Sequence, residues 1–74
     1  MGERIRRFTA RELERLLKDY GFELISQKGS HRKWRNPDKR LQVIVPHHGG
    51  RALPLGTLRA ILKGSEIPES EWTA

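Results

Sequence analysis

The sequence predicts a two-layer α+β fold: a helix, a three-stranded antiparallel sheet, a second helix and a short C-terminal helical turn. Apolar residues recur every three or four positions near the N-terminus and again after residue 54. Between these segments the apolar pattern changes to a period of two, and turn-forming residues interrupt it at short intervals. The chain has 74 residues, so we expect one small domain spanning residues 1–74.

The first helix is predicted to begin after Thr9, because Thr9 and Glu12 form a capping-box pattern. One apolar stripe follows at helical spacing, and its members are Ala10, Leu13, Leu16, Leu17 and Tyr20. Gly21 is expected to stop the helix. A row of cations, Arg11, Arg15 and Lys18, lies on the flank of the stripe. This row fits either a solvated face partly neutralised by Glu12 and Glu14 or a direct contact with phosphate.

Three short strands are predicted between the helices, over residues 22–27, 31–35 and 41–45. Gly29 bounds the first strand, Asn36-Pro37-Asp38 forms a turn after the second, and Pro46 ends the third. In the first strand we expect Phe22, Leu24 and Ser26 to share one face. In the second strand, alternation directs Trp34 toward the helices, and His31, Lys33 and Arg35 toward the opposite face.

The C-terminal part of the chain predicts a glycine-rich loop and a second helix. Residues 47–51 form the loop, Pro54 suits the first position of the helix, and Gly64 is expected to end it. Its apolar face consists of Leu55, Leu58, Ile61 and Leu62. Gly56 fits either a phosphate-binding helix N-terminus or close packing of the helix on the sheet. The tail is expected to make one helical turn that packs Trp72 on the body, with a frayed end as the alternative.

The positive charge is concentrated in the middle of the chain. The net charge is +6, and residues 28–51 contain seven Lys and Arg side chains against one Asp. Such a patch attracts polyanions and makes their binding dependent on salt. The alternative is a basic surface kept for solubility.

The composition also indicates the cellular compartment of the protein and excludes several classes of site. With no cysteine there is neither a disulfide nor a thiolate zinc site. No apolar run approaches the roughly 20 residues that a membrane span needs, and the N-terminal residues do not resemble a signal peptide. We therefore expect a soluble protein of the cytoplasm with no membrane partner.

His31 is the candidate for chemistry within the basic segment. Cleavage of RNA without a metal requires a base for the 2′-hydroxyl proton, an acid for the leaving oxygen and cations for the charge on phosphorus. Histidine serves in either proton-transfer role near neutral pH. Backbone N–H groups of the Gly29-Ser30 turn can approach a phosphate closely, and Lys33 and Arg35 supply positive charge on the same face.

Two other site classes are disfavoured. His47 and His48 are adjacent, which is not a usual zinc spacing, and no Asp, Glu or Cys nearby completes a ligand set, so we expect no metal and no cofactor. Sequence-specific DNA binding is disfavoured because no helix-turn-helix with a basic recognition helix is visible. The second helix offers only Arg59 and Lys63.

Four segments, taken in order and spacing, resemble the HicA toxins, also called YcfA-like proteins. They are LLKDYGF at 16–22, QKGSHRKW at 27–34, VPH at 45–47 and GTLRAIL at 56–62. The resemblance implies a fold like a double-stranded-RNA-binding domain and a translation-independent endoribonuclease that cuts mRNA, known as an mRNA interferase. It also implies a HicB-like antitoxin as partner, with His31 as the catalytic residue that the antitoxin covers.

The expected RNA-binding residues are Lys28, Gly29, Ser30, Lys33, Arg35 and His47. His47 is preferred to His48 because Val45-Pro46 fixes its register, although the doubled histidine departs from the family pattern. The second proton-transfer group stays open between His47 and water. A non-catalytic RNA-binding module that uses the same basic patch is the alternative function.

Overall fold

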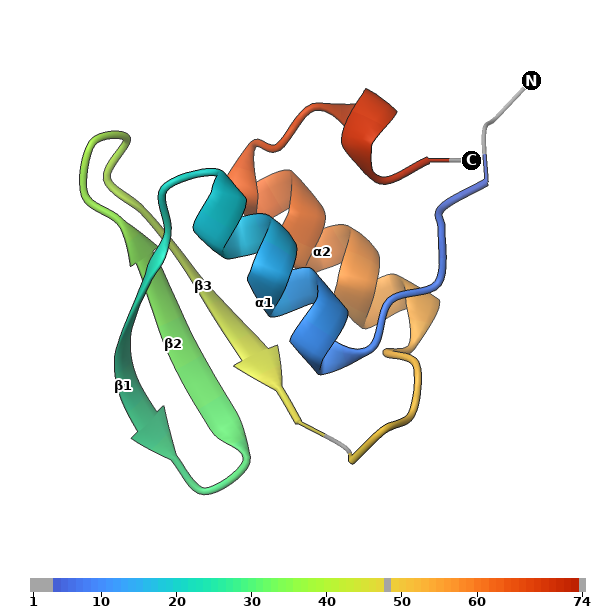
Figure 1. Cartoon of the computed structure of the whole chain (residues 1–74), viewed down its shortest axis with the longest axis horizontal. Coiled ribbons are helices and arrows are strands. Elements are labelled where there is room, and N and C mark those ends of the chain that lie inside the picture. The colour runs from blue at the N-terminus through green and yellow to red at the C-terminus, as the bar shows by residue number, and fades with distance from the viewer. Residues whose placement is uncertain (1–3, 48, 74) are drawn as a thin grey trace.

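The computed structural model describes residues 4–47 and 49–73 and shows the predicted α+β order (Figure 1). The elements are α1 (Ala10–Asp19), β1 (Glu23–Lys28), β2 (His31–Asn36), β3 (Leu41–Pro46), α2 (Leu55–Ser65) and the 3-10 turn η1 (Glu69–Glu71). The two helices lie together on one face of the antiparallel sheet, whose strand order is β1-β2-β3. Among the described residues, no helix is long and apolar enough to cross a membrane.

Helix α1 begins and ends as predicted. The amide N of Glu12 donates to Oγ1 of Thr9 at 3.2 Å, and the amide N of Thr9 donates to Oε1 of Glu12 at 2.8 Å, so the capping box is complete. Gly21 follows the helix with a φ of 87°, a left-handed conformation that glycine adopts without strain.

The sheet turns Trp34 inward, which confirms its predicted orientation. Trp34 is 2% exposed and pairs with Val43, and Arg32 pairs with Val45. These cross-strand partners face the helices, where Val43 and Val45 join the core. The predicted opposite face follows from the same alternation and carries His31, Lys33 and Arg35.

Strand β1 is less regular than expected. It begins at Glu23, and Phe22 lies before it in the core, so Phe22 does not share a strand face with Leu24 and Ser26. All six residues of β1 are exposed, and the register with β2 shifts between Leu24 and Ser26. The helices pack on β3 and leave β1 as an outer edge (Figure 1), which is why burial does not enforce alternation there.

Several element boundaries differ from the prediction for local reasons. Strand β2 continues through Asn36, which is 4% exposed and whose Nδ2 donates to the carbonyl of Tyr20 at 2.9 Å. Strand β3 includes Pro46. Pro54 caps α2 and is not its first residue. The helix passes Gly64 and ends at Ser65, because Glu66 takes the left-handed conformation instead.

Of the remaining expectations for the C-terminal part, one is excluded and one is confirmed. A side chain at Gly56 would meet nothing within 4 Å, so close packing does not explain this glycine. Trp72 is 5% exposed, and its Nε1 donates to the carbonyl of Ile67 at 2.8 Å, which confirms that the tail packs on the body through Trp72.

Candidate functional site

Most of the predicted site residues lie at one end of the sheet, where the β1–β2 turn lies beside the last residues of β3. Arg35 lies toward the other end of β2, where it pairs with Glu23 and Gln42. Gly29 has a φ of 58° and closes the turn. His31 pairs with Lys28 on one side and with Pro46 on the other. The amide N of His47 donates to the carbonyl of Ser30 at 2.7 Å. The topology therefore brings the Gly-Ser-His segment and the Val-Pro-His segment into direct backbone contact.

The outer face of the sheet is cationic around His31, and we call Lys28, His31, Lys33 and Arg35 the basic face. Lys28 is the cross-strand neighbour of His31, while Lys33 and Arg35 follow at two-residue spacing along β2. His31 and Arg35 are exposed and Lys33 is half-buried. None of the three cations forms an ion pair with a described carboxylate. The basic face can therefore receive an anion at His31.

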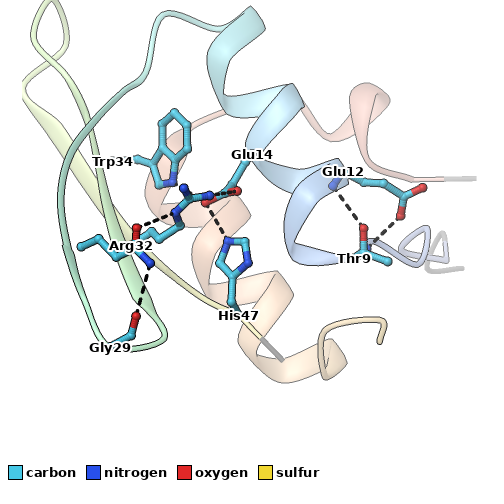
Figure 2. Close-up of polar contacts among 8 residues, drawn as sticks. Thr9, Glu12, Glu14, Gly29, Arg32, Trp34 and His47 are labelled. Carbon is cyan, nitrogen blue, oxygen red and sulfur yellow. Dashed lines mark hydrogen bonds and ion pairs between the residues drawn. The ribbon is translucent and has the colours of Figure 1, made fainter. Parts of the chain in front are cut away.

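Glu14 is the centre of a second group of polar side chains, on the helix side of the sheet (Figure 2). Its Oε1 accepts from Nη1 of Arg32 at 3.1 Å, and its Oε2 accepts from Nε1 of Trp34 at 2.8 Å. The residue is only 5% exposed. A buried carboxylate needs such partners to offset its loss of hydration, so Glu14 links α1 to β2 by charge and by hydrogen bonds.

His47 points toward Glu14, on the helix side of the sheet (Figure 2). Its Nε2 lies 3.0 Å from Oε2 of Glu14, within ion-pair distance, and this buried atom has no hydrogen-bond partner among the described residues. About 30% of the side chain is exposed. Because His31 pairs with Pro46 on the outer face, the structure places the His31 and His47 side chains on opposite sides of the sheet.

Glu14 was not predicted as a site residue, although the sequence held a signal for it. The buried residues of α1 are Ala10, Leu13, Glu14 and Leu17, which is the i, i+3, i+4, i+7 face of a helix. A carboxylate at the i+4 position of an apolar stripe indicates a buried partner. Glu14 therefore does not neutralise an exposed row of cations, as one of the two interpretations of that row assumed, because it is buried against Arg32 and Trp34.

The described residues contain no group of three His, Asp or Glu side chains close enough to hold a metal ion. His48, the alternative to His47, lies outside the described residues. The basic face and the Glu14 group therefore supply imidazole, ammonium, guanidinium and carboxylate groups from the described part of the chain.

Comparison with known proteins identifies the family of this chain. No curated protein matches the chain. A family model described as the HicA toxin of bacterial toxin-antitoxin systems matches residues 10–67, from the start of α1 to just beyond α2. This match spans the β1–β2 turn, the basic face and the Glu14 group, and the chain belongs to the HicA toxin family.

Proposed function

We propose that this protein is the toxin of a type II toxin-antitoxin system and acts as an endoribonuclease on mRNA, independently of translation. One observation carries the proposal: His31 is exposed directly after the Gly29-Ser30 turn, on the same sheet face as Lys33 and Arg35. A titratable imidazole on an open face that also carries cations suits a phosphodiester of RNA.

The reaction that fits these groups is an internal transfer at phosphorus. The 2′-hydroxyl loses its proton to a base and attacks the adjacent phosphorus, while the bond to the 5′-oxygen breaks and that oxygen gains a proton. The products are a 2′,3′-cyclic phosphate end and a 5′-hydroxyl end. His31 acts as the base or the acid, and water or a second group completes the exchange. No metal or other cofactor enters this scheme.

The remaining site residues bind the substrate in this proposal. Lys33 and Arg35, with Lys28, offset the charge that develops on phosphorus. The backbone N–H groups of Gly29 and Ser30 approach a phosphate oxygen. His47 contacts RNA through the exposed part of its ring, because its Nε2 is held at Glu14. We further propose that the protein acts in the cytoplasm and that a HicB-like antitoxin covers His31.

Cleavage of purified RNA in excess EDTA tests the proposal. We expect the wild-type protein to cut RNA under these conditions and the His31→Ala variant to lose cleavage while keeping its circular dichroism spectrum and melting temperature. Gln42→Ala is a matched control, because Gln42 pairs with Arg35 across the strands and is exposed. Full activity of His31→Ala, or cleavage that EDTA abolishes, would contradict the proposal.

One observation favours the non-catalytic alternative, an RNA-binding module. Among the described residues, His31 is the one imidazole on the basic face, since His47 lies on the other side of the sheet. Such a module would bind RNA in a salt-dependent way and yield no products, and His31→Ala would barely change its affinity. Growth arrest on expression, relieved by the antitoxin and lost in His31→Ala, would exclude this alternative.

A further inference from the structure

A broad open groove of about 960 Å³ runs along the exposed side of α1, separate from the basic face. Six cations line it: Arg6, Arg7, Arg11, Arg15, Lys18 and Arg32. They come from the N-terminal segment, from three positions of α1 and from β2. The row of cations on the flank of the first helix thus lines a groove. From the sequence alone, this row fitted either a solvated face or a contact with phosphate.

The negative charges of the groove are unevenly placed. Glu12 is bound to the backbone of Thr9, and Glu14 is covered by Arg32 and Trp34. The other two carboxylates, Asp19 and Glu71, lie at the C-terminal end of α1, beside Tyr20. The half of the groove near the start of α1 therefore presents mainly arginine, and the positive end of the helix dipole adds to it.

Arg32 lines this groove and also approaches the candidate site. Figure 2 shows its side chain between Glu14 and the turn at Gly29. Its Nη1 contacts Glu14 in the groove, and its Nε donates to Oε1 of Gln27 at 3.4 Å. Gln27 in turn donates from Nε2 to the carbonyl of Gly29 at 3.4 Å, in the turn that precedes His31. A strand of RNA bound at the turn would therefore meet the arginine end of the groove next.

We propose that the α1 groove binds the phosphate backbone of the single-stranded RNA that is cut at His31, with Arg11 and Arg15 as its main contacts. This inference rests on the proposed function and adds the extent of the substrate to it. Both arginines are exposed, and neither has a hydrogen-bond or ion-pair partner among the described residues. Guanidinium groups free of carboxylates are suited to phosphate oxygens.

Salt-dependent binding of a labelled single-stranded oligoribonucleotide tests this groove. Binding is measured in the His31→Ala background, so that the probe stays intact, with and without Arg11→Ala and Arg15→Ala. The plot of log K against log salt has a negative slope, and each lost phosphate contact reduces its magnitude by about 0.7. We therefore expect the two substitutions together to reduce the magnitude by about 1.4. With His31 present, the same pair should raise KM and leave kcat unchanged on long RNA, and should change neither on a dinucleotide.

The matched control is the pair Arg59→Ala and Lys63→Ala. These cations are exposed on α2 at the same four-residue spacing and do not line the groove. We expect the control pair to keep the wild-type slope. An unchanged slope in the Arg11 and Arg15 variant, or an equal loss in both pairs, would overturn the inference. Absence of RNA binding by the parent protein would instead contradict the proposed function itself.

Discussion

Trp34 donates a hydrogen bond from Nε1 to Oε2 of Glu14 at 2.8 Å, in a part of the molecule where both residues are buried. This contact joins the middle strand of the sheet to α1. It also holds the carboxylate that receives Arg32 and lies beside His47. The same contact therefore fixes α1, which lines the groove, against β2, which carries most of the basic face. The groove and the basic face lie on different sides of the sheet.

Replacing Glu14 by Ala should destabilise the protein by about 1–3 kcal/mol, because it leaves the buried indole N–H without an acceptor. Glu14→Gln should cost less, since an amide oxygen can still accept from Trp34. Urea unfolding followed by the fluorescence of the two tryptophans, Trp34 and Trp72, measures both variants.

The matched control for Glu14 is Glu12→Gln on the same helix. Glu12 is exposed, and glutamine also completes a capping box, so the free energy of unfolding should change by less than about 0.5 kcal/mol. If Glu14→Ala were as stable as this control, the hydrogen bonds of Glu14 would have no net role in stability.

The elements of the fold were predictable wherever a local pattern agreed with burial. Three features depend on only a few neighbouring residues each, and the structure shows all of them: the capping box at Thr9, the stop at Gly21 and the inward direction of Trp34. Strand β1 departed from its pattern because no helix covers it. Without a buried face, period-two alternation has nothing to enforce it, and the register shifts at Leu24.

The site was only partly predictable, because its polar contacts join distant segments. Alternation along β2 sufficed to put His31 with Lys33 and Arg35. The contact between Glu14 and His47 depends on how α1 crosses the sheet, and no spacing in the sequence encodes that crossing. The sequence therefore left open whether His47 works beside His31, and the structure places the two side chains on opposite sides.

In the proposed reaction, neutralising the basic face should affect the chemical step as well as binding. Changing Lys33 and Arg35 together to Gln is expected to lower kcat by about 10- to 100-fold, since charges near a reacting phosphate stabilise its transition state. Single-turnover cleavage of RNA measures this effect.

Lys39→Gln serves as the control for the basic face, because this exposed cation lies in the β2–β3 turn, at the end of β2 that is remote from His31. Its kcat should match that of the wild-type protein. If the Lys33 and Arg35 variant changed only KM, these residues would bind substrate without stabilising the transition state.

Glu66 offers a stabilising substitution at the end of α2. Its φ of 57° lies in the left-handed region, which costs a residue with a side chain about 1–2 kcal/mol. Glu66→Gly should raise the free energy of unfolding by about 0.5–1 kcal/mol after the added entropy of the unfolded chain is counted. Glu66→Ala keeps the strain and should give no gain, so equal stabilisation by both substitutions would exclude backbone strain as the cause.

Tyr20 is the chain's one tyrosine, so its ionisation can be followed by ultraviolet titration without interference from another phenol. Desolvation by burial raises the pKa of Tyr20 above its ordinary value, and the nearby carboxylates of Glu71 and Asp19 raise it further. The unfolded chain therefore releases this proton first as the pH rises. The folded protein should lose stability above the ordinary tyrosine pKa, near 10, until the folded form ionises as well.

Glu71→Gln should lower the pKa of Tyr20 toward its ordinary value, because it removes a negative charge that disfavours the phenolate. Glu69→Gln is the matched control, since Glu69 lies in the same 3-10 turn and does not contribute to the shift. An equal pKa change in both variants would mean that the overall charge of the tail acts on Tyr20. A change confined to Glu71→Gln would instead establish that the C-terminal turn docks against the end of α1 in solution, where it closes the acidic end of the α1 groove.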